Sequence, residues 1–114
     1  MNLLLVTTLL LSAAVVIGLY LVIVGLRRNK RIPTLGIAHA ALALSGIIVL
    51  LGHILGGPLD RLDNTAALFL FFALLGGVLV FSLHEENKGP SIPVVALHAV
   101  MGVVGISLLL INLF

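Results

Sequence analysis

The sequence predicts an all-α integral membrane protein, a four-helix transmembrane bundle in up-down-up-down order that forms one domain over residues 1–114. Hydrophobic residues make up 61% of the chain and charged residues only 9%, whereas soluble domains contain roughly 45–50% apolar and about 25% charged residues. Four apolar runs are each long enough to cross a bilayer core, which takes about 20 helical residues. The loops between them are short, so neighbouring helices must be antiparallel.

The four spans are expected at about residues 3–26, 33–55, 65–83 and 92–113. The first contains no charge and no basic stretch precedes it, so we interpret it as a retained span rather than a signal peptide. The second begins at Pro33, in the first helical turn, where the missing N–H of proline is tolerated. Before the third span, Asp63, Asn64 and Thr65 offer capping side chains.

The basic residues predict the orientation of the chain. Five of the six Lys and Arg residues lie in the first and third loops, and the middle loop contains one; the five are Arg27, Arg28, Lys30, Arg31 and Lys88. The positive-inside rule then places both termini outside the cytoplasm. We expect a multi-pass protein of the bacterial cytoplasmic membrane, in contact with lipid. A nucleic-acid partner is not expected, because the basic cluster carries no interleaved aromatics.

An internal repeat relates the two halves of the chain at an offset of 58 residues. The matches are Gly18 with Gly76, Asn29-Lys30 with Asn87-Lys88 and, after one extra residue in the later loop, His39 with His98 and Gly46 with Gly105. We interpret the chain as a duplicated two-helix hairpin. Its pseudo-two-fold axis would run along the membrane normal.

Each half carries a histidine a few residues after a proline, near the start of its second helix. An imidazole inside a membrane is costly unless something binds it. The second and fourth helices would be diagonal, about 14 Å apart if neighbouring helices are about 10 Å apart. Both run outward from the cytoplasmic side, so His39 and His98 should lie at nearly the same depth. That gap is wide for a direct hydrogen bond, but it suits two axial ligands with a haem iron between them.

Glycines are expected at the same depth on the other two helices. Counting about eight residues back from the cytoplasmic loops, at 1.5 Å of rise per residue, reaches Gly18 and the pair Gly76-Gly77. Small residues there would let the edges of a porphyrin slide between the helices. Glycine is also common in membrane helices for close packing alone. The basic loop residues would pair with the haem propionates.

This arrangement resembles the transmembrane b-type cytochromes, whose four-helix cores hold haem between histidines on the second and fourth helices. The resemblance implies that His39 and His98 bind one haem b. With both axial positions filled, it implies electron transfer rather than oxygen chemistry. A quinone or another membrane redox protein would be the partner. The chain would be an electron-transfer protein or an oxidoreductase subunit rather than a stand-alone enzyme.

Members of this family often carry a second ligand about four turns along the same helix, for a second haem. His53 follows His39 by 14 residues, which brings the two close to one helix face. The position equivalent to His53 in the fourth helix is Asn112, so we expect one haem. His53 is more typical of an interfacial histidine bonded to water or to the loop. His84 is interpreted as an interfacial residue that could touch a haem edge.

Other interpretations stay open. The histidine pair could be hydrogen-bonded or pH-sensing, or could bind a bare metal ion, although closed zinc or copper sites take three or four ligands. Cysteine is absent, which excludes thiolate ligands and iron–sulfur clusters. One alternative function is a small proton-coupled transporter that uses the histidine pair, similar in length to the small multidrug-resistance exporters but without their glutamate in the first span. Another is a haem-free scaffold or assembly subunit. Self-association into a homo-oligomer is also open.

Overall fold

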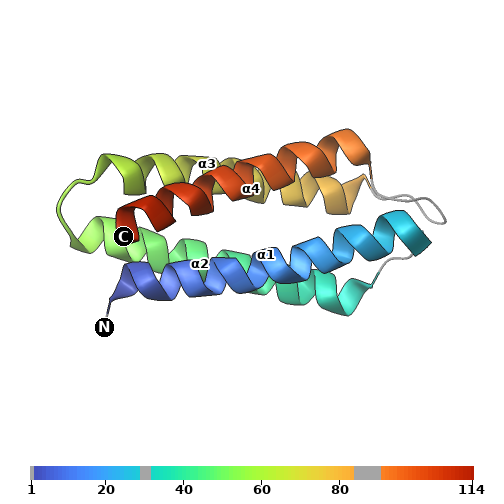
Figure 1. The fold of residues 1–114 in the computed structure, drawn as a ribbon, viewed down its shortest axis with the longest axis horizontal. Coiled ribbons are helices and arrows are strands. Elements are labelled where there is room, and N and C mark those ends of the chain that lie inside the picture. The colour runs from blue at the N-terminus through green and yellow to red at the C-terminus, as the bar shows by residue number, and fades with distance from the viewer. Residues whose placement is uncertain (1, 29–31, 84–90) are drawn as a thin grey trace.

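The computed structural model describes residues 2–28, 32–83 and 91–114, which form four α-helices (Figure 1). The helices are α1 (Leu3–Arg28), α2 (Pro33–Gly56), α3 (Arg61–Ser82) and α4 (Ile92–Leu113). Each is long and apolar enough to cross a membrane. The molecule is 48 Å long, close to the thickness of a bilayer with its headgroups, about 40–45 Å. The predicted four-helix transmembrane bundle is therefore confirmed.

The start of α3 differs from the prediction. We expected the third helix from Thr65, but it begins at Arg61, and Asp60 is its N-cap. The side chain of Asp60 accepts hydrogen bonds from the backbone N–H groups of Leu62 (2.8 Å) and Asp63 (3.1 Å). Several residues in this stretch are good N-caps, so composition alone does not select one. Asp63 consequently lies in the first turn of α3 and not in the loop.

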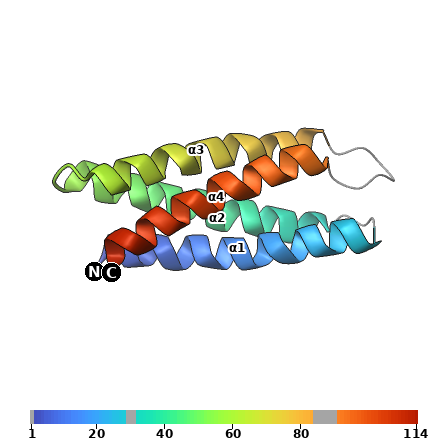
Figure 2. The ribbon, with the colours of Figure 1, turned by 45° about the horizontal axis from the view of Figure 1, so that its top comes forward.

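The four helices form two hairpins. Helix α1 packs along α2 and α3 packs along α4, whereas the contacts between the hairpins, α2 with α3 and α1 with α4, are far fewer. Helices α2 and α4 are diagonal and make no close backbone contact. In both ribbon views α1 and α4 lie close together near the two termini and diverge toward the opposite end (Figures 1 and 2). The bundle is thus closed at one end and more open at the other.

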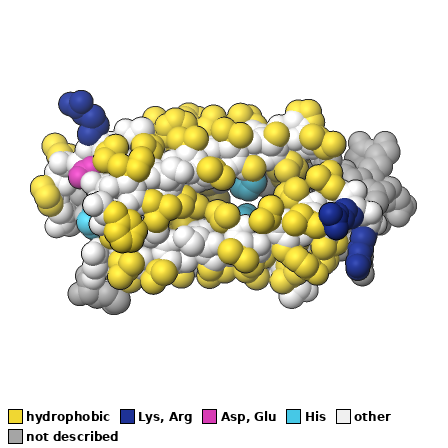
Figure 3. Space-filling view, viewed as in Figure 1, with side chains coloured by type: hydrophobic (Ala, Val, Ile, Leu, Met, Phe, Trp, Pro, Cys, Tyr) yellow, Lys and Arg dark blue, Asp and Glu magenta, His cyan; other side chains and the backbone are white. Residues whose placement is uncertain are grey.

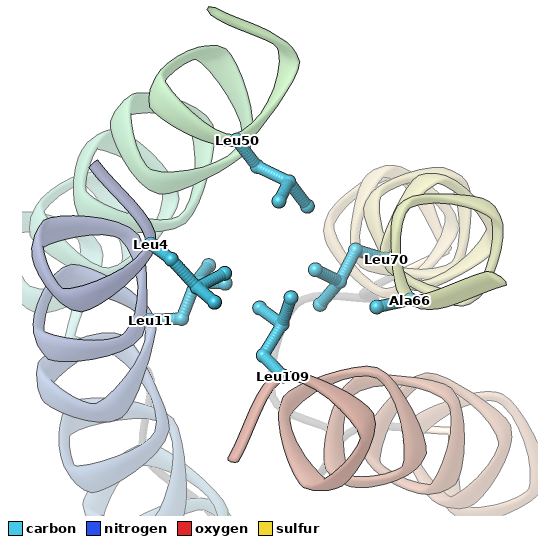
Figure 4. Packing of buried hydrophobic residues seen from close by; sticks show 6 residues of the cluster. All are labelled: Leu4, Leu11, Leu50, Ala66, Leu70 and Leu109. Atoms are coloured by element: carbon cyan, nitrogen blue, oxygen red, sulfur yellow. The ribbon is translucent and has the colours of Figure 1, made fainter. Parts of the chain in front are cut away.

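The hydrophobic core occupies the half of the bundle that contains the termini. Side chains from all four helices point into one space there (Figure 4), namely Leu4, Leu11, Leu50, Ala66, Leu70 and Leu109. We refer to these six residues as the leucine layer. Leu50, Ala66 and Leu109 are completely buried. The leucine layer is where the two hairpins are packed against each other.

The outer faces of the helices are apolar and exposed. Leu9, Val16 and Leu19 each expose 60% or more of their surface, and hydrophobic side chains cover most of the face shown in Figure 3. The charged side chains of the described residues gather at the two ends of the molecule (Figure 3). This distribution matches helices whose outward faces contact lipid tails.

Candidate functional site

His39 and His98 approach each other between the hairpins. Their ring centroids lie 5.9 Å apart and their planes make an angle of 80°. Both side chains are partly buried. The expectation that the two histidines lie at one depth therefore agrees with the structure. The imidazoles are the only aromatic pair among the described residues that joins the two hairpins.

Each imidazole is held by a backbone carbonyl of the neighbouring helix in its own hairpin. Nδ1 of His39 lies 2.7 Å from the carbonyl oxygen of Ala14, and Nδ1 of His98 lies 2.6 Å from that of Ala73. A carbonyl oxygen can only accept a hydrogen bond, so each Nδ1 carries the proton and donates. In the neutral ring, Nε2 then keeps a free lone pair. Neither Nε2 has a hydrogen-bond partner among the described residues.

Three glycines make room for these rings. A Cβ on Gly18 would lie 2.9 Å from Cε1 of His39, and a Cβ on Gly77 would lie 3.1 Å from Cε1 of His98. A Cβ on Gly76 would lie 3.3 Å from the Cα of His98. We expected these glycines at the level of the histidines, where they would leave room for the edges of a porphyrin. In the structure Gly18 and Gly77 contact the imidazole rings, and Gly76 contacts the Cα and Cβ of His98. The absence of a side chain at Gly18 and Gly77 lets each ring reach the carbonyl one turn earlier.

The two hairpins repeat their contacts at a constant offset of 59 residues. The equivalent contacts are His39 to Ala14 with His98 to Ala73, Gly18 to His39 with Gly77 to His98, and Gly46 to Leu11 with Gly105 to Leu70. The predicted offset of 58 in the first helix of each half is therefore wrong by one residue. Gly77, and not Gly76, is the structural equivalent of Gly18. The matched pairs Asn29-Lys30 and Asn87-Lys88 lie outside the described residues.

The interior next to the histidines is open. The inward stripe of α2 contains Gly36, and that of α4 contains Gly102, and a Cβ on either glycine would meet nothing within 4 Å. No member of the leucine layer lies in this half of the bundle. Figure 3 shows a hollow between the hairpins with histidine atoms on both sides of it. The sequence analysis did not single out these two glycines, although each lies within four residues of a histidine.

A second polar cluster lies at the end of the bundle beside the α2–α3 loop. Nε2 of His53 donates to Oδ2 of Asp63 (3.0 Å), and Nδ2 of Asn112 donates to Oδ1 of Asp63 (2.7 Å). The Asp63 side chain is 4% exposed and that of His53 is 32% exposed. His53 is thus an interfacial histidine, as expected, but its partner is a buried carboxylate in the first turn of α3.

Asp60 extends this cluster to the loop. Its carboxylate accepts from Nδ2 of Asn112 (3.2 Å) as well as from the start of α3. The pKa of Asp60 lies below its ordinary value of 3.8, chiefly because the backbone N–H of Asp63 stabilises the ionised form. The hydrogen bonds from Asn112 and Leu62 act in the same direction, against an opposing effect of burial.

The remaining predicted site residues lie at the opposite end. Arg27 and Arg28 form the last turn of α1, on the side of the histidines away from the leucine layer. His84, Lys30, Arg31 and Lys88 lie outside the described residues. Among the described residues, no three His, Asp or Glu side chains are grouped so that they could hold a metal ion. No known protein family, curated protein or solved structure shows significant similarity to this chain.

Proposed function

We propose that this chain is a small membrane b-type cytochrome that binds one haem b between His39 and His98. The observation that supports it best is the pair of imidazoles whose Nδ1 atoms are both bonded to carbonyls. Histidines that ligate metals through Nε2 usually donate the other ring N–H to such an acceptor, which fixes the tautomer and the ring orientation. Two diagonal helices present this same arrangement to one central space.

The spacing of the rings fits two axial ligands. Two iron–imidazole bonds of about 2 Å, with roughly 1.1 Å from each nitrogen to its ring centre, separate two axial rings by roughly 6 Å. The observed centroid separation is 5.9 Å. A site with two protein ligands suits a metal that brings its other ligands with it. A bare metal ion would need a third or fourth protein ligand, and the described residues do not group one there.

The open interior supports a bulky, flat and apolar ligand. Gly36 and Gly102 leave space on the inward stripes of the ligand-bearing helices. The hairpins diverge on this side of the leucine layer (Figure 2). A natural core has few voids larger than a water molecule, because unfilled space forfeits packing contacts. We infer that a porphyrin fills this part of the bundle.

Haem bound in this way supplies one-electron chemistry. His39 and His98 would hold it, and with two protein ligands it would supply electron transfer rather than oxygen chemistry. The bonds from Nδ1 to Ala14 and Ala73 would raise the basicity of the two ligands. Arg27 and Arg28 at the end of α1 are candidates to pair with the propionates. The electron partner would be a lipid-soluble quinone or a membrane redox protein.

Orientation follows from the basic residues. We propose that the end of α1 with Arg27 and Arg28 faces the cytoplasm, that both termini lie on the other side, and that the membrane is a bacterial cytoplasmic one. The histidine site would then lie in the cytoplasmic half of the bilayer. The cluster of His53, Asp63 and Asn112 would lie at the outer surface.

Optical spectroscopy tests the proposal directly. Purified protein should show the α-band of a six-coordinate b-type haem in a reduced-minus-oxidised spectrum. The band should be absent from the His39→Ala, His98→Ala double variant and unchanged in Thr65→Val, which alters an exposed hydrogen bond within α3. A wild-type protein that takes up no haem during expression or on titration with hemin would rule the proposal out.

The transporter alternative predicts a different measurement. Two unpartnered Nε2 atoms could exchange protons, but the leucine layer separates them from the polar cluster at the other end. A continuous proton path needs polar groups or water through that layer, which supports electron transfer over proton coupling. Proton-coupled uptake by proteoliposomes that is lost in His39→Ala would favour the transporter.

A further inference from the structure

One corner of the bundle joins the two hairpins through both the chain and a side-chain hydrogen bond. The loop from Gly57 to Asp60 connects α2 to α3, and the hydrogen bond between His53 and Asp63 lies beside it. Among the described residues this is the one side-chain hydrogen bond that crosses between hairpins. The bonds of His39, His98 and Asn112 to their partners each stay within a hairpin or its loop.

In a membrane this bond restrains the hairpins in addition to the packing of the leucine layer. Lipid tails are as apolar as leucine, so the leucine contacts gain little from the hydrophobic effect and act through packing alone. A hydrogen bond has a definite length and direction. The buried carboxylate of Asp63 also has to keep its donors, because a buried polar group without hydrogen bonds is costly. The bond therefore restrains the end of α2 relative to the start of α3.

Among the described residues, the hydrogen bond between His53 and Asp63 has no counterpart on the other side of the bundle. At the constant offset of 59 residues, the equivalent of Asp63 is Leu4, and the equivalent of His53 is Asn112. Leu4 is buried and cannot accept a hydrogen bond, so Asn112 turns to Asp63 and Asp60 instead. The pseudo-symmetric junction between α1 and α4 consequently has no matching bond. A change at the corner that holds the His53–Asp63 bond would therefore let the hairpins turn relative to each other.

Such a turn would be amplified at the histidine pair. His39 lies 14 residues from His53 along α2, which corresponds to about 21 Å of helix. A rotation of roughly 10° about that corner would move the helix by about 4 Å at that level. Metal sites tolerate distance changes of only about 0.2 Å. A small change of angle at one end therefore decides whether the two rings can share one ligand.

We propose that the hydrogen bond between His53 and Asp63 sets the angle between the hairpins and thereby positions the His39 and His98 rings. His53 and Asp63 are positioning residues and touch no ligand at the histidine site. The link to haem binding rests on the proposed function, whereas the effect on hairpin angle does not. The two parts can be measured separately.

Distance measurements on the haem-free protein test the first part. The chain has no cysteine, so Ala40→Cys and Ala99→Cys give two unique spin-label sites. These residues are exposed, equivalent at the offset of 59, and adjacent to the two histidines. Pulsed electron paramagnetic resonance in nanodiscs of defined lipid should give one narrow distance distribution. His53→Leu and Asp63→Leu should shift or broaden it by several ångströms, whereas Asp63→Asn, which keeps one acceptor oxygen for one of the two donors, should change it less.

The matched control is a substitution in α3 that does not touch the hydrogen bond between His53 and Asp63. Thr65→Val, which loses a hydrogen bond confined to α3, should leave the distribution unchanged. An unchanged distribution in a folded His53→Leu variant would overturn the proposal. If Asp63→Leu does not insert into the membrane, His53→Leu alone tests the proposal, because the His53 side chain is one-third exposed. Hemin titration of the same proteins tests the second part. Variants with altered distances should bind hemin at least tenfold more weakly than the wild type. Equal affinity would show that the angle between the hairpins does not control hemin binding. If the wild type binds no hemin, the proposed function fails while the distance result stands.

Discussion

The Nδ1 atom of His98 lies 2.6 Å from the carbonyl oxygen of Ala73, and the equivalent bond joins His39 to Ala14. In both hairpins the acceptor alanine is followed four residues later by a glycine that contacts the ring, Gly77 or Gly18. The contact exists because the helix surface at that point has no side chain. The orientation of each imidazole thus depends on the helix beside it.

Substituting the glycines should disturb the rings in a graded way. Gly18→Ala brings a methyl group to 2.9 Å from Cε1 of His39, and Gly77→Ala brings one to 3.1 Å from Cε1 of His98. We expect both to weaken hemin binding, by about 10- to 100-fold as for other losses of metal-ligand support, with Gly18→Ala the more severe. Gly52→Ala, with open space around its Cβ, is the control. Equal affinities in all three variants would contradict the assigned role of the glycines.

Filling the open interior should separate haem binding from folding. Gly102→Leu places an apolar side chain in space where a Cβ meets nothing within 4 Å. We expect the haem-free protein to unfold at the same temperature or higher, because leucine is the better helix former by about 0.8–1 kcal/mol. Hemin binding should be lost, because the side chain occupies the space assigned to the porphyrin. Retained binding with full stoichiometry would show that the ligand lies elsewhere.

Two equivalent glycines in the tight part of the bundle should respond unequally. A Cβ on Gly46 meets only leucine side-chain atoms, the nearest at 2.8 Å on Leu11. A Cβ on Gly105 meets Leu70 at 2.7 Å and also the carbonyl oxygen of Ala66 at 3.3 Å, which cannot rotate away. We expect Gly105→Ala to cost about 1–3 kcal/mol and Gly46→Ala less. Reversible unfolding in mixed micelles measures both, and the reverse order would count against this packing.

The acid side of the stability profile should depend on Asp60. Its folded-state pKa lies below the ordinary value of 3.8 because it accepts hydrogen bonds as a carboxylate. A depressed pKa contributes stability that is complete above the unfolded value and is lost as the pH falls toward the folded value. Thermal unfolding between pH 3 and 7 should therefore show a decline below about pH 4, and Asp60→Ala should flatten that decline. An identical slope in the two proteins would contradict it.

Thr7 offers a test of buried polarity. Its hydroxyl is completely buried, and among the described residues it is the one buried side-chain polar atom without a hydrogen-bond partner. Replacing an unsatisfied polar group by an apolar one of the same shape is neutral or stabilising. We expect Thr7→Val to unfold at the same temperature or higher. Thr8→Val, which loses a 2.8 Å bond to the carbonyl of Leu4, is the comparison and should not gain stability.

Hydropathy and the repeat predicted the most regular parts of this structure. The spans follow from apolar length, which the bilayer thickness fixes, and every helix end except the start of α3 lies within two residues of its expected position. The common depth of His39 and His98 follows from similar spacing after a proline, six residues after Pro33 and five after Pro93. These features depend on distances along the chain, which a sequence contains directly.

The features that were missed depend on packing between helices. A shift of one residue turns a helix face by about 100°, and only contacts between helices, such as those of Ala73 and Gly77 with His98, separate an offset of 59 from one of 58. Spacing does contain one unused signal: Ala14 and Ala73 each lie 25 residues before a histidine. The cap at Asp60 and the burial of Asp63 could not be predicted, because the next residues cap equally well.

The leucine layer has a consequence for energy conservation. It fills the bundle on one side of the histidine pair, so water and soluble redox partners would reach a redox group held there from the other face only. The membrane potential is worth about 2.3 kcal/mol per elementary charge per 100 mV across the whole thickness. An electron that enters and leaves by the same face crosses little of that field. The proposed cytochrome would therefore pass electrons without charging the membrane.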